Sequence, residues 1–225
     1  MIKKLCVLIP SFNEGKTIGA IVKSLKVRNI VTYVVDDGST DDTANIAAEE
    51  GAIVVKHKVN KGKGASLREG FKHILKKEYD AVIVMDADGQ HMVEDIDSFL
   101  KRDGETGADM IIGNRMSDIS GMPMVRVHTN RFMSWLVSLI AKQRIPDSQS
   151  GYRLFKSNLL TKILPELVSS NYEIESEMII RASRAGFRID AAPIKTVYQD
   201  EKSRINPVTD TLRFILFLVR ISIVK

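Results

Sequence analysis

The sequence predicts a single α/β domain with a mostly parallel central sheet flanked by helices. Three observations lead to this prediction. Apolar runs alternate with segments of helical periodicity over residues 1–110, polar turns follow those runs, and no linker rich in glycine, serine or proline divides the chain. A chain of 225 residues has the size of one such domain and can fold without a disulfide or a metal.

The first half alternates strands with helices. Strands are expected at residues 5–10, 30–35, 52–56, 81–85 and 110–113, where apolar and β-branched residues end in turn residues. Helices are expected at residues 17–26, 41–50 and 64–77. In the first of these, apolar residues recur at helical spacing from Ile18 to Leu25. Strands that alternate with helices in this way pair in parallel.

The second half is less regular. Helices are expected at residues 129–141, which contain the only tryptophan, and at 174–185, with an extended segment at 188–197. The tail has a helical pattern in which Arg213 and Arg220 share one stripe. We therefore expect a domain at residues 1–208 and an amphipathic C-terminal helix at 209–225. Within the domain, residues 1–110 form a ligand-binding half and 111–208 a half that meets a second partner.

Composition excludes several classes of protein. The chain is 44% hydrophobic and 27% charged, which argues against disordered and collagen-like proteins. Cys6 is the only cysteine, so no intramolecular disulfide can form, and a cytoplasmic location is expected. The N-terminus does not resemble a signal peptide and no apolar run is long enough to span a membrane.

Charge is distributed unevenly along the chain. Residues 1–110 contain 16 basic and 18 acidic residues, whereas residues 111–225 contain 17 and 10. The net charges are therefore −2 and +7. The excess in the second half predicts an anionic partner, with a solvated basic face as the alternative. Nucleic acid is not expected, because no basic run interleaved with aromatic residues occurs.

Four polar clusters follow the first four expected strands. They are Pro10-Ser11-Phe12-Asn13-Glu14, Asp36-Asp37-Gly38-Ser39, Asn60-Lys61-Gly62-Lys63-Gly64 and Asp86-Ala87-Asp88-Gly89-Gln90. In an open parallel sheet, ligands bind outside the carboxyl ends of the strands, so the clusters are expected to form one site.

Each cluster offers a particular chemistry. Asp86 and Asp88, with Gln90 nearby, could hold a divalent cation and leave room for diphosphate oxygens, although aspartate-rich turns are also common at strand ends. Of Asp36 and Asp37, one could accept hydrogen bonds from a nucleoside while the other caps the next helix. The glycine-rich turn could offer backbone N–H groups to an anion or be simply a flexible turn.

These motifs, read together, resemble family 2 glycosyltransferases of the GT-A fold. The matching segments are Pro-Ser-Phe-Asn-Glu at 10–14, Val-Val-Asp-Asp-Gly-Ser-Thr-Asp-Asp-Thr at 34–43, Asn-Lys-Gly-Lys-Gly-Ala at 60–65 and Asp-Ala-Asp-Gly-Gln-His at 86–91. Asp-Ser-Gln-Ser-Gly-Tyr-Arg at 147–153 is similar to a later motif of the polyprenyl-phosphate (dolichyl-phosphate) mannosyl- and glucosyltransferases. The resemblance runs from about residue 4 to residue 205.

The resemblance implies roles for individual residues. Donor-binding residues would be Pro10, Asn13, Glu14, Asp36, Asp37, Lys63, Asp86 and Asp88. A Mg²⁺ or Mn²⁺ ion would be held by Asp86, Asp88 and Gln90. The acceptor phosphate would be bound by Arg115, Arg131, Ser203 and Arg204. Asp147, near the sugar, and Arg131 would be catalytic.

The implied reaction is inverting transfer from GDP-mannose or a UDP-hexose to a polyprenyl phosphate. A phosphate monoester is largely ionised at pH 7 and needs no general base, so Asp147 would orient the donor or the arginines. With a hydroxyl acceptor, Asp147 would be the base. The lipid acceptor implies peripheral contact with the inner face of a membrane through the helix at 209–225, unless that helix packs in the core or in an oligomer.

Other functions stay open at this stage. The main alternative is a family 2 glycosyltransferase that acts on a saccharide or another hydroxyl acceptor. A sugar-phosphate nucleotidyltransferase would need a glycine-rich basic loop after the first strand, where this chain has Pro-Ser-Phe-Asn-Glu. A binding module without catalysis is disfavoured by the intact set of Asp86, Asp88, Gln90 and Asp147.

Overall fold

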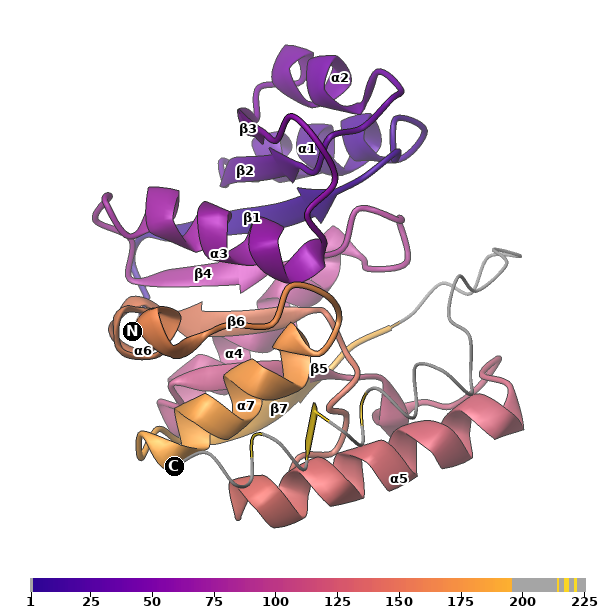
Figure 1. The fold of residues 1–225 in the computed structure, drawn as a ribbon, viewed down its shortest axis with the longest axis vertical. Coiled ribbons are helices and arrows are strands. Elements are labelled where there is room, and N and C mark those ends of the chain that lie inside the picture. The colour runs from indigo at the N-terminus through magenta and orange to yellow at the C-terminus, as the bar shows by residue number, and fades with distance from the viewer. Residues whose placement is uncertain (1, 196–213, 215–216, 219–220, 222–225) are drawn as a thin grey trace.

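The computed structural model describes residues 2–195 together with residues 214, 217, 218 and 221, and it forms an α/β domain (Figure 1). The strands are β1 (Leu5–Ser11), β2 (Val31–Asp36), β3 (Ile53–Lys56), β4 (Ala81–Val84), β5 (Met110–Asn114), β6 (Arg153–Lys156) and β7 (Ile189–Pro193). Within the described residues they form one seven-stranded sheet in the order β3-β2-β1-β4-β6-β5-β7. Its pairings are parallel except those of β6, which runs antiparallel to β4 and β5.

Helices cover both faces of this sheet. They are α1 (Ile18–Val27), α2 (Thr43–Glu49), α3 (Lys63–Ile74), α4 (Ile96–Thr106), α5 (Met124–Ala141), α6 (Ser157–Ile163) and α7 (Ile174–Arg184). Short 3₁₀ helices lie at η1 (Val93–Asp95), η2 (Arg115–Ser117) and η3 (Leu164–Glu166). Figure 1 shows α3, α5 and α7 in front of the sheet and α1 and α4 behind it.

The core is divided into two clusters by the sheet. In β1, Cys6 and Leu8 join the cluster under α3, α5, α6 and α7, whereas Val7 and Ile9 join the cluster under α1, α2 and α4. This division follows from the two-residue period of a strand. Because both faces are covered, the ends of the strands are left to bind a ligand.

Most of the predicted elements are observed, with shifted ends. The largest shift is in the helix expected at 129–141, which begins at Met124, directly after Pro123. The extended segment expected at 188–197 is observed as β7, and residues 196–197 lie outside the described part of the chain. The sequence pattern did not predict α4, β6 or α6. The strand β6 has only four residues, too few to show a periodicity.

The predicted C-terminal helix lies mostly outside the described residues. Those of its residues that the structure describes are helical. Phe214, Leu218 and Ile221 are buried in the first core cluster, in company with Met133 and Val137 of α5. These apolar side chains therefore pack in the core and do not face a membrane. None of the described helices is long and apolar enough to cross a bilayer.

Candidate functional site

The structure brings the four polar clusters together at the carboxyl ends of β1, β2 and β4. The backbone N–H of Asn13 donates to Ser39 Oγ over 2.9 Å, and that of Thr40 donates to Asn13 Oδ1 over 2.8 Å. Thr17 Oγ1, just before α1, donates to the carbonyl of Ala87 in the fourth cluster over 2.6 Å. Asn13 has a φ of 57°, a left-handed conformation that asparagine tolerates well.

A pair of buried polar side chains lies at the ends of β1 and β2. Ser11 and Asp36 are partners in the register of these strands and are 4% and 0% exposed. Asp36 Oδ1 accepts from the backbone N–H of Ser39, but Asp36 Oδ2 and Ser11 Oγ are buried without a hydrogen-bond partner among the described residues. Buried oxygens in this state are suited to a ligand that supplies N–H or O–H groups, as a nucleoside does.

Asp37 shapes the turn before α3. Its carboxylate accepts hydrogen bonds from the backbone N–H groups of Lys61 and Gly62, at 2.9 and 2.8 Å, and lies 2.7 Å from His57 Nδ1. The possibility that Asp37 caps the helix following it is therefore wrong. That helix, α2, begins only at Thr43, and the Asp37 side chain turns toward another segment.

The glycine-rich turn before α3 approaches another loop closely. The N–H of Gly64 donates to the carbonyl of Ser170 over 2.7 Å, so this amide and those bound by Asp37 are already engaged within the protein. A Cβ on Gly62 or Gly64 would lie 2.4 or 2.3 Å from a carbonyl oxygen of the 169–170 loop. The glycines are thus explained by close backbone contact, and the expectation of an anion cradle in this turn is not met.

Lys63 is the centre of a buried cluster of charges. Its ammonium donates to Asp86 and, over 2.7 Å, to Glu175 Oε1 at the start of α7. Burial disfavours the charged form of Lys63, but Asp86 and Glu175 outweigh that effect and raise its pKa above the ordinary value. Burial alone would also raise the pKa of Asp86; the Lys63 ammonium, with His91 and Arg115, lowers it to about 2. The pair is therefore fully ionised at neutral pH.

His91 stays neutral beside this cluster. Burial lowers its pKa to about 4, although the negative charge of Asp86 acts in the opposite direction. Its Nδ1 lies 3.2 Å from the backbone nitrogen of Asp86 and can accept that hydrogen bond, and its ring stacks on Tyr152 at 4.8 Å. A neutral ring in this position orients the loop that carries Asp86 and Asp88.

The residues present fit a divalent cation. Asp86, Asp88 and Gln90 are half-buried, and Asp88 Oδ1 accepts from the N–H of Gln90 over 2.9 Å. Carboxylate and amide oxygens are the ligands that Mg²⁺ and Mn²⁺ prefer. Among the described residues there is no group of three acidic, histidine or cysteine side chains that could hold a metal alone. A cation bound here would therefore complete its coordination with water or with oxygens of a ligand.

Asp147 is held by an arginine. Arg115 donates to both carboxylate oxygens of Asp147, from Nε over 2.8 Å and from Nη2 over 2.9 Å, and its backbone N–H adds a third bond. Asp147 is fully buried. Such a bidentate, charge-assisted contact fixes the plane of the guanidinium.

Arg153 anchors the loop that follows Asp147. This arginine is 1% exposed and donates to the carbonyls of Ser150 and Ser148, over 2.7 and 2.8 Å, and to that of Glu175. It thereby ties the loop to α7 and adds a cation next to the Lys63 cluster. Gly151 lies within the same loop, where a Cβ would be 2.4 Å from Asp86 Oδ2.

Four further residues were assigned from the resemblance, three to the acceptor phosphate and Pro10 to the donor. Arg131 is exposed on α5, one turn before Ser134, which bonds through its hydroxyl to Ser148 of the Asp147 loop. Pro10 lies in β1 opposite Val35. Ser203 and Arg204 are outside the described residues.

Two residues of the site were not identified from the sequence. Glu175 is far from Lys63 along the chain, and Arg153 was quoted within a motif without a role. A signal for Glu175 existed, because it occupies the buried stripe of α7 together with Met178 and Ala182. A carboxylate at such a position is almost always paired.

The chain is similar in sequence to known proteins. The sequence profile described as glycosyl transferase family 2 matches residues 6–164. The chain is 30% identical over 219 residues to the UDP-N-acetylglucosamine–dolichyl-phosphate N-acetylglucosaminyltransferase of Methanococcus voltae, with 88% of this chain and 87% of that protein covered. It is 32% identical over 210 residues to the undecaprenyl-phosphate mannosyltransferase of Micrococcus luteus, covering 88% and 85%.

Solved structures establish the fold. The chain is similar to glucosyl-3-phosphoglycerate synthase from Mycobacterium tuberculosis, solved with Mn²⁺, UDP and glucosyl-3-phosphoglycerate, with a TM-score of 0.72 and 18% identity over 98% of this chain and 80% of that one. Mannosyl-3-phosphoglycerate synthase from Rubrobacter xylanophilus gives a TM-score of 0.73 at 19% identity, over 96% and 72%. The predicted GT-A fold is confirmed.

Proposed function

The chain belongs to glycosyl transferase family 2, and we propose that it transfers a sugar from a nucleotide-diphosphate sugar to a polyprenyl phosphate with the help of Mg²⁺ or Mn²⁺. The acceptor class is supported by two relatives named for dolichyl and undecaprenyl phosphates, each aligned over most of this chain. The use of a metal is supported by the Mn²⁺ in a structure of the same fold.

Donor binding would use the edge of β1, β2 and β4. The oxygens of Ser11 and Asp36 that have no partner among the described residues would accept hydrogen bonds from the nucleoside, and Asn13 would hold the surrounding loops in place. Asp86, Asp88 and Gln90 would hold the cation against the diphosphate. When bound, that ion would stabilise the negative charge that develops on the leaving diphosphate. The Lys63 ammonium, retained by Glu175, would supply a second positive charge there.

In the transfer step, an oxygen of the acceptor phosphate forms a bond to the anomeric carbon while the bond from that carbon to the diphosphate breaks. The configuration inverts and the nucleoside diphosphate leaves. No proton needs to be removed, because the acceptor phosphate is largely ionised at pH 7. Arg115, oriented by Asp147, would position the acceptor phosphate, helped by Arg131, Ser203 and Arg204.

The observation that carries this mechanism is the bidentate contact between Arg115 and Asp147. A hydroxyl acceptor would require a general base near the sugar, and Asp147 is the residue that would serve. Instead both of its carboxylate oxygens are engaged by a guanidinium. An acceptor that brings its own negative charge makes use of that arrangement.

The test is a matrix of donors with and without a short polyprenyl phosphate. UDP-N-acetylglucosamine, UDP-glucose and GDP-mannose are each incubated with Mg²⁺ or Mn²⁺, and nucleoside diphosphate release and the mass of the lipid product are measured. We expect one donor to be consumed only when the lipid is present, and we expect Asp88→Ala to abolish this turnover. Glu78→Ala, at a carboxylate whose side chain is 95% exposed, is the matched control and should keep full activity.

Other outcomes of the matrix redirect the proposal. Metal-dependent donor binding without turnover on the lipid would move the acceptor to a saccharide or another hydroxyl compound. Failure to bind any donor would contradict the proposal.

A further inference from the structure

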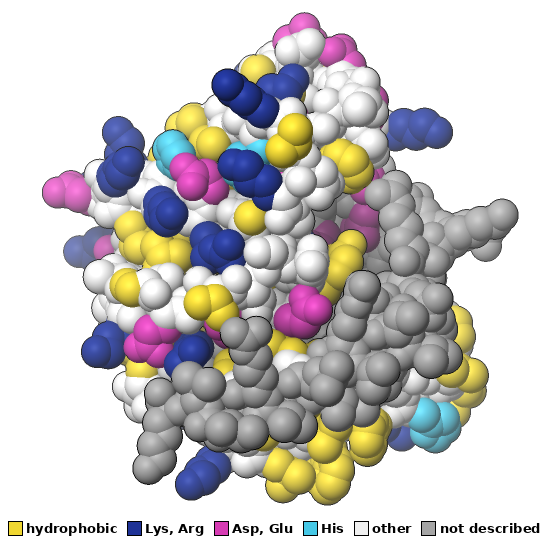
Figure 2. Space-filling view, in the orientation of Figure 1, with side chains coloured by type: hydrophobic (Ala, Val, Ile, Leu, Met, Phe, Trp, Pro, Cys, Tyr) yellow, Lys and Arg dark blue, Asp and Glu magenta, His cyan; other side chains and the backbone are white. Residues whose placement is uncertain are grey.

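The outer face of α5 carries a stripe of exposed apolar side chains. Val125, Phe132, Trp135 and Leu139 are 80%, 50%, 55% and 58% exposed. Their spacing places them on one side of the helix, and the rings of Phe132 and Trp135 are 6.0 Å apart. Figure 2 shows hydrophobic side chains along the lower margin of the molecule, where Figure 1 places α5. A contiguous apolar stripe of this kind marks an interaction surface.

Residues 119–146, which include α5, carry charge of one sign. Residues 119–146 contain no aspartate or glutamate, but they contain Arg126, Arg131, Lys142 and Arg144. The last three of these line an open groove of about 530 Å³ together with Trp135 and Leu139. Basic side chains thus flank the apolar stripe on the side of this groove.

We propose that this outer face of α5 docks on the surface of a lipid bilayer that contains anionic lipid. Phe132, Trp135 and Leu139 lie at the boundary between headgroups and acyl chains, and the basic side chains of the groove meet lipid phosphates. Helices that bind in this way combine an apolar face with aromatic residues and flanking lysine or arginine, and the outer face of α5 has each of these features. The inference rests on the proposed function, because a polyprenyl phosphate resides in a bilayer.

The inner face of α5 contacts the loop that contains Asp147. The helix therefore connects the proposed membrane surface with the site. Ser134 on that face accepts a hydrogen bond from the backbone N–H of Ser148, over 2.8 Å, next to Asp147. Pro146, which precedes Asp147, lines the same groove as Trp135. The groove therefore runs from the proposed membrane surface toward the loop that orients Arg115.

The docking face differs from the one expected from the sequence, which assigned membrane contact to the helix at 209–225. Of the described apolar residues of that segment, Phe214, Leu218 and Ile221 are buried in the core with Met133 and Val137 of α5, and Phe217 is partly buried against the same cluster. The helix α5 thus has one side against the core and the opposite side available to lipid.

Trp135 provides a direct test, because it is the only tryptophan in the chain. The full chain is mixed with vesicles of phosphatidylcholine and phosphatidylglycerol, without any nucleotide sugar, and tryptophan emission is recorded. We expect a blue shift that saturates with lipid, and quenching by lipids brominated on the acyl chain near the headgroup. Unchanged emission at high vesicle concentration would overturn the proposal.

Paired variants show which residues are responsible. Phe132→Ser with Leu139→Ser keeps the tryptophan and should reduce vesicle binding at least tenfold, whereas Val27→Ser with Val168→Ser, at exposed apolar positions elsewhere, should leave it unchanged. Lys142→Gln with Arg144→Gln should weaken binding to anionic vesicles about 20-fold, and high salt should do the same. Equal binding by the α5 variants and the control pair would overturn the proposal.

Two further outcomes separate this inference from its premises. A blue shift that grows with protein concentration in the absence of vesicles would assign the face to a second copy of the chain and overturn the docking proposal. If the protein binds vesicles but consumes no donor, only the proposed reaction is contradicted. If it transfers sugar to a water-miscible short acceptor but does not bind vesicles, only the docking surface is contradicted.

Discussion

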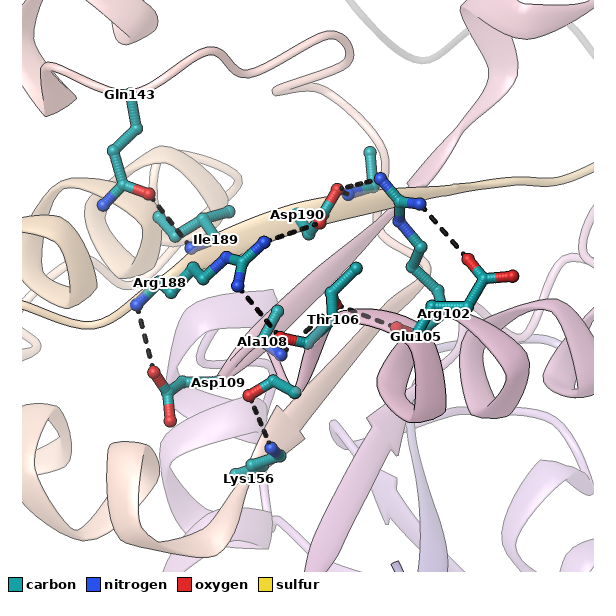
Figure 3. A network of polar contacts seen from close by, with 12 residues as sticks. Arg102, Glu105, Thr106, Ala108, Asp109, Gln143, Lys156, Arg188, Ile189 and Asp190 are labelled. Carbon is teal, nitrogen blue, oxygen red and sulfur yellow. Dashed lines mark hydrogen bonds and ion pairs between the residues drawn. The ribbon is translucent and has the colours of Figure 1, made fainter. Parts of the chain in front are cut away.

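The two ends of the strands carry networks of charged side chains that differ in burial. At the amino ends of β5 and β7, Arg188 donates from its backbone to Asp109 and from its guanidinium to the carbonyl of Thr106, both over 3.0 Å, and Arg102 pairs with Asp190 over 2.9 Å (Figure 3). The arginines of this network reach solvent, with 38% and 62% of the side chains of Arg102 and Arg188 exposed.

The network at the carboxyl ends is buried instead. The side chains of Lys63 and Glu175 are 14% and 10% exposed, and that of Asp147 is fully buried. Buried ion pairs seldom add stability, since desolvation opposes the attraction between the charges. The amino-end network fastens β7 and α4 together, whereas we propose that the carboxyl-end network serves the chemistry of the site.

The largest effect on stability is expected from Lys63→Met. This change leaves the buried carboxylate of Glu175 and the half-buried carboxylate of Asp86 without the cation that pairs with both. Removing one partner from a buried ionic group typically lowers the free energy of unfolding by about 3–5 kcal/mol. Urea denaturation at pH 7 measures the loss. A loss below about 1 kcal/mol would show that the cluster is solvated and would remove the contrast between the two ends.

A loss of folding stability that is confined to acidic pH is expected from the protonation of His91. Because its pKa in the folded protein is lowered to about 4, the unfolded chain binds a proton below the ordinary value near 6.5 while the folded chain does not. Stability should therefore fall by on the order of 3 kcal/mol as the pH drops from 6.5 to 4. His91→Asn, whose side-chain oxygen can replace Nδ1 as acceptor, should remove this part of the pH dependence. An unchanged pH profile of denaturation midpoints would argue that His91 titrates normally.

Asp147→Asn tests the role of the buried carboxylate in catalysis. Without its charge, Arg115 is held less firmly, and we expect kcat to fall about 10- to 100-fold, since misplacement of a positioning group costs about that much. The pH–rate profile should keep its shape. If the variant loses the acidic limb of that profile, Asp147 is a general base and the acceptor carries a hydroxyl group.

The smallest effect is expected at the opposite end of the sheet. Arg102→Met removes an exposed contact with Glu105 and a partly buried contact with Asp190, and the arginine itself reaches solvent, so the free energy of unfolding should change by no more than about 1 kcal/mol. The same urea titration used for Lys63→Met provides the comparison. A loss as large as that of the lysine variant would mean that exposure does not distinguish the two networks.

Much of the site could be predicted because it follows local rules. The strands β1, β2 and β4 are apolar runs that end in polar turns, and parallel pairing places those turns at one edge. The alignment of Ser11 with Asp36 follows from the strand register, which no local pattern of residues specifies. The close backbone contact between the turn at Gly62 and Gly64 and the loop at 169–170 could not be predicted either, since the two segments are distant in sequence.

The sequence by itself determined the order of strands and helices from β1 to β4, the GT-A family motifs and the types of side chain available at the carboxyl edge. These follow from periodicity, turn chemistry and spacing, which act over a few residues. Only the tertiary structure decided that the Lys63 ammonium pairs with both Asp86 and Glu175. It also decided that Arg115 donates hydrogen bonds to Asp147 and that the apolar stripe of α5 faces outward. Such pairings depend on which distant segments pack together, and burial then sets the strength of each charge contact.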